Sequence, residues 1–352
     1  MKKIRIVTIY DNTNIGNRLQ NYAVQKCFCR FTTDVSTNST PEGQLIGWKG
    51  KIVRFIGFPR HKAAEKRLME KRRDRFRMFT RQHIMTNASK SFSEHIAKKT
   101  GQDEIFVVGS DQIWGNWELT NERISYIFLD FVPEGKRICF APSFGFDEFP
   151  SKKRERYIQG LNGFRHLSCR EQSGCDLIKA ATGREATLLV DPTMLLTTDE
   201  WDAIAKKPEY TVPERFMLVY FLGGKSRETK KEIHHLADKN NLEIVDIYDA
   251  MQADYFLTAP DEFLYLVKQA EMVCTDSFHG CVFSILYKKQ LRYFLRNGAL
   301  GTQMSNRQKT LFEKFKIFDE TGNCDYSNVD AILENERKKA REYLEMVLAD
   351  TE

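Results

Sequence analysis

Four short apolar runs in this chain end in polar residues that begin a turn. The turns contain Gly-Ser-Asp at 109–111, Arg-Glu at 170–171, Asp-Pro at 191–192 and Thr-Asp-Ser-Phe-His-Gly at 275–280. Buried strands that alternate with helical segments are typical of a parallel sheet. Because ligands bind beyond the carboxyl ends of parallel strands, we expect these polar groups to line a functional edge.

The alternation of strand-like and helix-like segments divides the chain into two units. Strands are predicted at 4–10, 106–108, 137–140, 167–169 and 188–190, and then at 216–222, 242–248, 272–275 and 291–295. Helices are predicted at 19–31, 60–81, 226–240, 260–270, 278–287, 310–315 and 328–348. This rhythm predicts an α/β fold class with two doubly wound units.

Segments rich in turn-forming residues mark the boundaries between these units. Residues 32–50 are rich in Ser, Thr, Gly and Pro and are predicted to form an exposed loop, and 206–215 carries two prolines among charges and is the best linker. The predicted organisation is therefore an N-terminal domain (1–205), a linker (206–215), a C-terminal domain (216–322) and a C-terminal helix (323–352).

Length and composition are those of a water-soluble, two-domain protein. The chain has 352 residues, of which 41% are hydrophobic and 29% charged, and no run is long enough to span a membrane. Its basic start leads into an apolar run that Asp11 and Asn12 interrupt, so we do not expect a signal peptide. The eight cysteines form no CxxC pair and several lie in apolar runs, which indicates buried, reduced thiols in the cytoplasm and no metal site.

The positive charge of the chain is concentrated in one segment. The net charge is +6, whereas residues 60–81 hold ten Lys or Arg and three Asp or Glu, a local charge of +7. The rest of the chain is near neutral, which argues against a nucleic-acid-binding protein. From Trp48 to Arg81, apolar and aromatic residues beside cations suit peripheral contact with the inner face of an anionic membrane; the open alternative is a packed helix with a solvated basic neighbour.

Several of these motifs together resemble the polysaccharide pyruvyl transferase family. The matching pieces are listed here in chain order: Asn14, Gly16, Leu19-Gln20 and Tyr22-Ala23, then GSDQIW (109–114), SCREQSG (168–174), DPTMLL (191–196) followed by Trp201, TDSFHG (275–280), and Ser305-Asn306-Arg307 followed by Leu311. They cover roughly residues 1–320. One departure is KKQLRY at 288–293, where the family often has Pro-Phe.

The resemblance implies a fold and a reaction. The fold is glycosyltransferase-B-like, with two facing α/β domains and a C-terminal helix. The reaction moves the enolpyruvyl unit of phosphoenolpyruvate onto a sugar of a surface polysaccharide or its lipid-linked precursor, forming a cyclic pyruvate ketal and releasing phosphate. Phosphoenolpyruvate is a co-substrate, and no further cofactor is expected.

This reaction requires a proton donor, cationic groups for carboxylate and phosphate, and a base. His279, at the start of a helix, is the expected proton donor and phosphate ligand, with Ser277 and Gly280 beside it. Arg170 and Arg307 are the expected donor clamps, and Asp276 could orient His279 or act as the base. The segment 301–309, which carries Arg307, is predicted to be a polar loop. The alternatives left open are a structural role for His279, a helix cap for Ser277, an ion pair of Arg170 with Glu171 or Asp176, a solvated loop residue for Arg307 and a turn residue for Asp276.

The acceptor is expected to bind on the facing N-terminal domain. The expected acceptor residues are Asn14, Gly16, Asn17, Ser110, Asp111 and Trp114. Asp111 is a candidate base, with a turn-capping role as its alternative. Trp114 and Trp117 could present a face to a sugar, although core packing explains them equally well. Asp191-Pro192 is interpreted as a rigid turn.

Two other functions are compatible with the same features. A nucleotide-sugar glycosyltransferase would use a similar two-domain cleft but a different donor. A non-catalytic protein could recognise an anionic glycan through the basic segment, although the presence of both Arg170 and His279 argues against it.

Overall fold

The computed structural model describes residues 2–39, 62–87, 94, 101, 103–115, 120–296, 299–319 and 322–351. In its N-terminal half, parallel strands form a five-stranded sheet in the order β3-β2-β1-β4-β5. The strands are β1 (Lys3–Val7), β2 (Val35–Asn38), β3 (Thr86–Asn87), β4 (Glu104–Val108) and β5 (Arg137–Cys139). The central strand β1 is apolar from Ile4 to Val7 and buried there, as expected for a strand covered on both faces.

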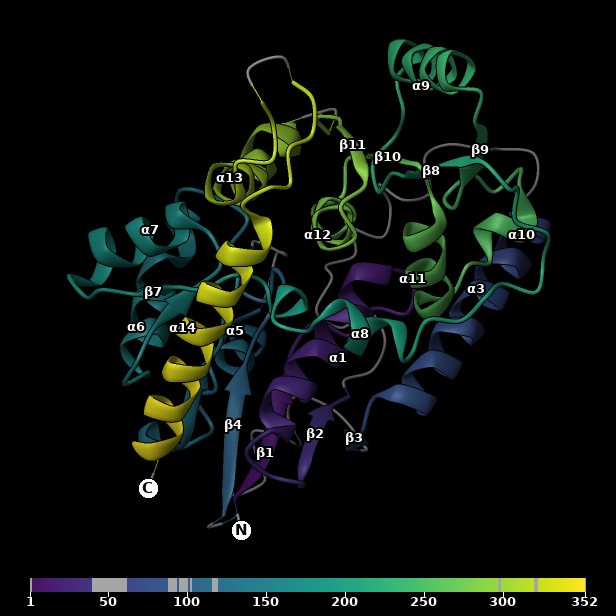
Figure 1. Cartoon of the computed structure of the whole chain (residues 1–352). Helices are drawn as coiled ribbons and strands as arrows, with labels where there is room; N and C mark the ends of the chain where they lie inside the picture. Colours follow the sequence, from purple (N-terminus) through teal and green to yellow (C-terminus); the bar gives the residue numbers. More distant parts are fainter. Residues whose placement is uncertain are drawn as a thin grey trace.

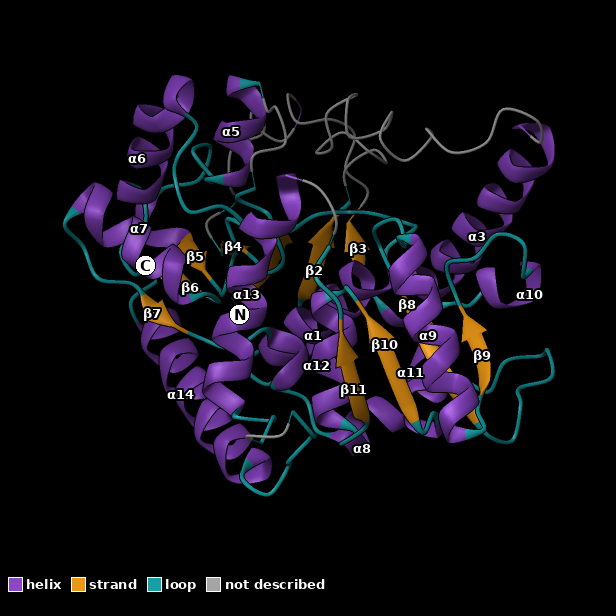
Figure 2. Ribbon diagram, turned by 90° about the horizontal axis from the view of Figure 1, so that it is seen from above, coloured by secondary structure: helices purple, strands orange, loops and turns teal. Residues whose placement is uncertain are grey.

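The C-terminal half has its own parallel sheet, in the order β11-β10-β8-β9. These strands are β8 (Phe216–Tyr220), β9 (Glu243–Asp246), β10 (Met272–Thr275) and β11 (Gln290–Tyr293). A separate parallel pair, β6 (Ser168–Cys169) and β7 (Thr187–Leu188), lies on the side of the N-terminal half. In Figure 2 this pair lies beside β5, and Ser168 of β6 donates to the carbonyl oxygen of Cys139 at 2.8 Å. The sheet of the C-terminal half lies on the other side of the molecule in that view.

Helices surround these sheets. The α-helices of the first half are α1 (Ile15–Cys29), α3 (Lys62–His83), α5 (Asn121–Ile127), α6 (Arg154–Asn162), α7 (Gln172–Thr182) and α8 (Thr198–Asp202). Those of the second half are α9 (Arg227–Asn240), α10 (Ala253–Phe256), α11 (Pro260–Gln269), α12 (Phe278–Leu286) and α13 (Ala299–Phe315), followed by α14 (Val329–Ala349). Short 3-10 helices are η1 (Glu134–Lys136), η2 (Ser151–Lys153) and η3 (Pro192–Met194).

The C-terminal helix α14 returns to the N-terminal half, and the two chain ends lie near each other (Figure 1). Tyr343 donates a hydrogen bond to the carbonyl oxygen of Cys139 at the end of β5, 2.7 Å away. Lys2 donates to the carbonyl oxygen of Leu348 at 2.6 Å. These contacts attach the last helix to the first sheet.

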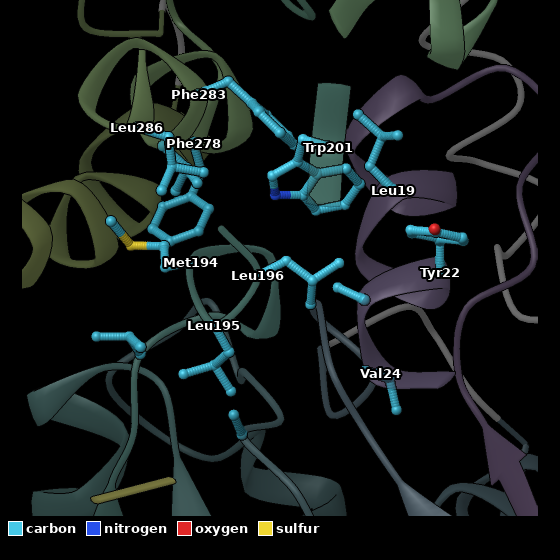
Figure 3. Packing of buried hydrophobic residues seen from close by; sticks show 14 of the residues in the cluster. Leu19, Tyr22, Val24, Met194, Leu195, Leu196, Trp201, Phe278, Phe283 and Leu286 are labelled. Atoms are coloured by element: carbon cyan, nitrogen blue, oxygen red, sulfur yellow. The ribbon is translucent and has the colours of Figure 1, made fainter. Parts of the chain in front are cut away.

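The two halves share one apolar core. Figure 3 shows Trp201, from α8, between Phe283 of α12 and Leu19 of α1, with Met194 of η3 beside Phe278. The Trp201 side chain is fully buried, with ring centroids 5.5 Å from Tyr22 and 5.1 Å from Phe283. Because protein cores are close-packed, this contact fixes the polar strand ends of one half relative to those of the other.

The basic helix α3 also joins the two halves. Arg72 is buried, and its guanidinium lies 4.4 Å from the ring centroid of Tyr248 and donates to the carbonyl oxygen of Ile247 at 3.2 Å. Arg75 forms an ion pair with the buried carboxylate of Glu262. Arg72 and Arg75, which contribute to the +7 charge of this segment, therefore make their contacts inside the molecule.

The predicted fold class is confirmed: an α/β protein with two parallel sheets and a C-terminal helix. Two local predictions are wrong. β2 lies within the predicted 32–50 loop, because its Ser and Thr side chains are buried against α1, where Asn21 and Gln25 donate to Thr37 at 2.7 and 3.0 Å. Residues 301–309, predicted as a polar loop, lie in helix α13. The domain boundaries stay a prediction.

Other sequence predictions concern single residues and the membrane. Six cysteines are buried and none forms a disulfide, but Cys29 is exposed and Cys324 is partly so. Within the described segments, none of the helices combines the length and apolar character that a membrane crossing requires. Residues 48–61, including Trp48, and Trp117 lie outside the described residues.

Candidate functional site

Charged side chains from both halves meet between the two sheets. Asp111 follows β4, Arg170 follows β6 and Asp191 follows β7, whereas His279 comes from α12 and Arg307 from α13. Each of these residues is at most 9% exposed. The expectation of one shared edge is therefore correct for these strand ends, including that of Asp191.

The β4 turn is shaped by a glycine. Gly109 has φ +141°, and a Cβ atom there would lie 1.9 Å from the carbonyl oxygen of Phe140, the residue that follows β5. Only glycine fits so close to a neighbouring backbone. The turn places Ser110, which donates to the carbonyl oxygen of Ala141 at 2.8 Å, and then Asp111.

The start of α1 holds Asp111. Asn14 caps the helix by accepting from the backbone N–H of Asn17 at 3.2 Å, as Asn does at many helix starts. The Asn17 side chain donates through Nδ2 to Asp111 Oδ2 at 3.1 Å. Asn14 and Asn17 therefore support the carboxylate in this structure, and a direct role with the acceptor stays a prediction.

Arg170 joins two carboxylates in the middle of the site. Its Nη2 donates to Asp111 Oδ1 at 3.2 Å, and its Nη1 donates to Asp191 Oδ2. Burial alone lowers the pKa of Arg170, but Asp191, Asp111 and Glu171 raise it above its usual value. Arg170 is thus an ion-pair residue, as the alternative interpretation had it, but its close partners are Asp191 and Asp111. Of the two partners expected, Glu171 is farther, with Oε2 3.9 Å from Nε.

The two carboxylates stay ionised because cations surround them. Burial alone raises the pKa of Asp111, but Arg170, His279 and Asn17 bring it below its usual value. Burial likewise opposes ionisation of Asp191, yet Arg170 and His279 hold the pKa of Asp191 well below its usual range. Both groups are therefore ionised at neutral pH.

His279 lies between α1 and Asp191. Its Nε2 is 3.7 Å from Asp191 Oδ2, a distance too long for a hydrogen bond, and that nitrogen has no hydrogen-bond partner. The other side of the ring packs against Gly16: a Cβ atom on Gly16 would lie 2.1 Å from His279 Nδ1. In this structure, the missing side chain of Gly16 makes room for the imidazole.

Replacing Gly16 with alanine is expected to displace His279. The new methyl group requires the ring to move by about 1 Å, and a misplacement of that size can cost on the order of 10²-fold in rate. We expect turnover to fall by about that factor in Gly16→Ala, with a modest loss of thermal stability from overpacking. Gly224→Ala is the matched control, because no atom lies within 4 Å of its Cβ position. Equal turnover in the two variants would contradict this role of Gly16.

Arg307 brings a second guanidinium to the site. Both guanidinium groups lie over the ring of Phe278, with Arg170 4.5 Å and Arg307 5.6 Å from its centroid. Arg307 Nε is buried without a hydrogen-bond partner. Burial, together with the nearby charge of Arg170, lowers the pKa of Arg307 to about 10. Arg307 is therefore a buried helix residue, not a solvated loop residue.

Asp276 does not contact His279, which corrects the expected orienting role. Its carboxylate accepts from the backbone N–H groups of Leu222 and Gly223 at 2.7 and 2.8 Å, and Arg296 donates to it at 3.0 Å. Asp276 thus anchors the loop after β8. The carboxylate closest to His279 is that of Asp191.

The start of α12 is held by its own residues. Ser277 caps the helix by accepting from the N–H of Gly280 at 3.3 Å, so the helix-cap alternative is correct. A Cβ atom on Gly280 would lie 2.3 Å from Thr275 Oγ1, which shows how closely the helix packs on β10. Contact of Ser277 or Gly280 with the donor stays a prediction.

Trp114 is part of the core, which corrects its assignment to the acceptor site. The side chain is fully buried, and its Nε1 donates to the carbonyl oxygen of Ile127 at 3.1 Å. Its ring stacks on Phe128 with centroids 5.3 Å apart. No face of this ring is available to a sugar.

Sequence reasoning missed the role of Asp191. Its position after an apolar strand was the correct signal, but the following proline favoured a rigid turn. The structure shows that it does both: Asp191 Oδ1 accepts from Thr193 N and Oγ1 at 3.0 and 2.7 Å, while Oδ2 faces Arg170 and His279. Among the side chains that the structure describes, no group of three or more His, Cys, Asp or Glu is arranged to hold a metal ion.

The sequence model of the polysaccharide pyruvyl transferase family matches residues 14–297. This range contains the charged cluster except Arg307. A search of curated proteins finds no match.

Solved structures with a similar outline include UDP-GlcNAc 2-epimerases and a protein in complex with UDP and glucose. UDP-GlcNAc 2-epimerase from Neisseria meningitidis, bound to UDP-GlcNAc, is 8% identical with a TM-score of 0.46, over 99% of this chain and 100% of that one. A putative UDP-N-acetylglucosamine 2-epimerase from Listeria monocytogenes is 12% identical with a TM-score of 0.47, over 97% and 88%. Anabaena HepE, in complex with UDP and glucose, is 10% identical with a TM-score of 0.45, over 99% of each chain. Values this low say nothing about the activity of this chain.

Proposed function

The chain belongs to the polysaccharide pyruvyl transferase family, and on that premise we propose its donor, its chemistry and the roles of its residues. The proposed donor is phosphoenolpyruvate, and no further cofactor takes part. The proposed acceptor is a sugar of a surface polysaccharide or its lipid-linked precursor. The product is a pyruvate ketal, and inorganic phosphate is released.

The proposed reaction makes two bonds to C2 of the donor. One sugar hydroxyl attacks C2 while C3 takes up a proton, the electrons of the double bond forming the new C–H bond. A second hydroxyl then displaces phosphate, closing the ketal ring. The proton of the first hydroxyl balances the one that C3 gains, and the proton of the second leaves with phosphate.

The observation that carries this proposal is the meeting of two buried guanidinium groups and an imidazole beside two ionised carboxylates. Arg307 is held near Arg170 against the same phenyl ring, where burial and like charge oppose its protonation. A ligand carrying carboxylate and phosphate groups supplies the negative charge that this pair lacks. Arginine also suits both groups because it can bind each with two parallel hydrogen bonds.

The roles follow from which half provides each group. His279 and Arg307, from the second half, are assigned to the donor: His279 protonates C3 and Arg307 binds phosphate or carboxylate. Asp111, from the first half, is assigned as the base for the sugar hydroxyl, since its pKa lies below the usual value and it is ionised at neutral pH. Arg170 connects the two sides and stabilises charge on the donor.

A lipid-linked acceptor requires that the enzyme work in the cytoplasm close to the membrane. The outward cations of α3 include Lys66, Lys71 and Arg81, which are exposed. Arg73 and Arg77 are partly neutralised by Glu70 and Asp74. Contact of residues 48–81 with an anionic membrane stays a prediction.

Ligand-induced stabilisation distinguishes the donors. Phosphoenolpyruvate is expected to raise the melting temperature of the protein, because a ligand that binds only the folded state stabilises it. With a panel of acceptor glycans, transfer is followed as release of inorganic phosphate and a gain in acceptor mass. Stabilisation by UDP-N-acetylglucosamine but not by phosphoenolpyruvate would instead indicate the nucleotide-sugar glycosyltransferase. Binding of neither ligand, with retention on an anionic glycan, would indicate the non-catalytic alternative.

A further inference from the structure

We propose that Glu171 and the Nε atom of Arg170 together bind a hydroxyl group of the acceptor sugar. This inference rests on the proposed function, because it takes a sugar as the acceptor. A pyruvate ketal requires two hydroxyl groups of that sugar, and Asp111 is assigned as the base for one of them. Glu171 and Arg170 hold the second hydroxyl, which closes the ketal ring.

Two buried polar atoms at the β6 turn face each other without a hydrogen bond. Within the described part of the chain, Arg170 Nε and Glu171 Oε2 are each buried and have no hydrogen-bond partner. They lie 3.9 Å apart, which is too far for a hydrogen bond between them. Because buried polar groups in native proteins are nearly always paired, a donor and an acceptor left in this way indicate a position for a ligand group.

The separation of the two atoms fits one hydroxyl group. An oxygen atom about 2.8 Å from each of them, at ordinary hydrogen-bond distance, closes a triangle with an angle of about 90° at that oxygen. Such a hydroxyl accepts from the Nε–H of Arg170 and donates its own proton to Oε2 of Glu171. An ionised carboxylate cannot donate and an ammonium group cannot accept, so neither suits both atoms.

The other oxygen of Glu171 is already occupied. Oε1 accepts from the backbone N–H groups of Phe144 and Gly145 at 2.8 and 3.4 Å. Although Glu171 directly precedes α7, its side chain makes no capping hydrogen bond with that helix. The loop after β5 therefore fixes the carboxyl group, and Oε2 is the oxygen that remains for a ligand.

This position lies next to the assigned base. Nη2 of Arg170 donates to Asp111 Oδ1 at 3.2 Å, and the N–H of Ser143 donates to the carbonyl oxygen of Asp111 at 2.8 Å. On a guanidinium group, the Nε–H bond is parallel to one N–H bond of Nη2. A hydroxyl on Nε is therefore held beside the Asp111 carboxylate, so that two hydroxyls of one sugar can reach Asp111 and Glu171 together.

The alternative is that Glu171 only balances the charge of Arg170, with a water molecule bridging the two side chains. The variant Glu171→Gln tests this. Its amide oxygen is expected to stay on the N–H groups of Phe144 and Gly145, which places the NH₂ group where Oε2 was. The position then donates instead of accepting, and the hydroxyl loses its acceptor. Asp176→Asn on α7 is the matched control, because it makes the same chemical change on an exposed side chain.

Binding of defined sugars measures the contact directly. The probes are the methyl glycosides of glucose, galactose and mannose with their monodeoxy analogues, titrated by NMR against the wild type, Glu171→Gln and Asp176→Asn. For the glycoside that binds best, we expect loss of one particular hydroxyl to weaken binding to the wild type about 10-fold or more, as for other hydrogen bonds to charged groups. Glu171→Gln is expected to weaken the parent glycoside by a similar factor and to bind the deoxy analogue equally well, so the two losses are non-additive. Asp176→Asn should behave as the wild type does.

Glu171→Asp is the second variant, in case Glu171→Gln does not fold. It keeps the charge but withdraws the oxygen by one methylene, so a hydroxyl site predicts weaker glycoside binding and a charge-balancing role predicts none. Additive losses in the deoxy series, or unchanged glycoside binding in Glu171→Asp, would overturn the proposal, as would a wild type that binds none of the glycosides. Phosphoenolpyruvate is titrated in parallel: if it does not bind while the coupling between Glu171 and one hydroxyl persists, the donor assignment fails and the hydroxyl site stands.

Discussion

Turnover in His279→Ala is expected to fall by a factor on the order of 10²–10⁴, the usual contribution of a general acid. The alanine variant loses both the proton that C3 requires and a cationic contact to phosphate. His279→Gln retains a hydrogen-bond donor for the phosphate, so donor binding is expected to recover in part while turnover stays low. Phosphate release under saturating phosphoenolpyruvate measures the first effect, and the thermal shift produced by phosphoenolpyruvate measures the second.

The matched control is His234→Ala on α9, where the imidazole is exposed and outside the cluster. This variant is expected to keep normal turnover. A folded His279→Ala protein that turns over nearly as fast as His234→Ala would show that the imidazole is structural.

The sequence was sufficient to predict most elements of the fold, because its apolar runs are short and clearly bounded. The strand expected at 272–275 coincides with β10, and the helix expected at 260–270 differs from α11 by one residue. The pattern of apolar runs does not reveal β2, because its residues VSTN are mostly polar. These residues are buried against α1, which donates a hydrogen bond to Thr37. Such burial depends on partners that are far away in the sequence.

The candidate site was predictable as a set of strand ends, but the pairing of its side chains was not. Position after a strand indicated Asp111, Arg170, Asp191 and Asp276 equally well. The structure divides them: Asp111 and Asp191 both contact the guanidinium of Arg170. Asp276 instead accepts hydrogen bonds from the backbone of Leu222 and Gly223. The division depends on how the second sheet faces the first, which no local pattern encodes.

Arg307 was an expected site residue, but the helix that carries it was missed for a similar reason. The segment 301–309 is polar and was interpreted as a loop, but it lies on α13, and Arg307 reaches the ring of Phe278. Polar residues on a helix that faces a charged site produce no amphipathic stripe, so periodicity does not reveal the helix.

Replacing Arg307 with methionine is expected to weaken donor binding without destabilising the protein. Truncating one partner of a buried charged contact typically costs 2–5 kcal/mol, so the dissociation constant of phosphoenolpyruvate should rise about 30-fold or more. Arg307→Lys keeps the charge but not the paired hydrogen bonds, so its affinity for phosphoenolpyruvate should lie between those of the wild type and of Arg307→Met. Arg292→Met on β11 is the control, since that exposed guanidinium pairs with Glu232 outside the cluster.

The stability of the ligand-free protein gives the second half of this prediction. The pKa of Arg307 is lowered to about 10 in the folded state, so folding disfavours its protonated form. For a basic group with a lowered pKa, the unfolded chain binds the proton more tightly, and stability is reduced at every pH below about 10. At neutral pH the penalty is therefore complete, and Arg307→Met is expected to melt at the same temperature as the wild type or higher. Phosphoenolpyruvate should reverse this order of melting temperatures, because it stabilises only the protein that retains the Arg307 guanidinium. A variant that melts well below the wild type without ligand, yet gains as much from phosphoenolpyruvate, would show that Arg307 supports the fold and does not bind the donor.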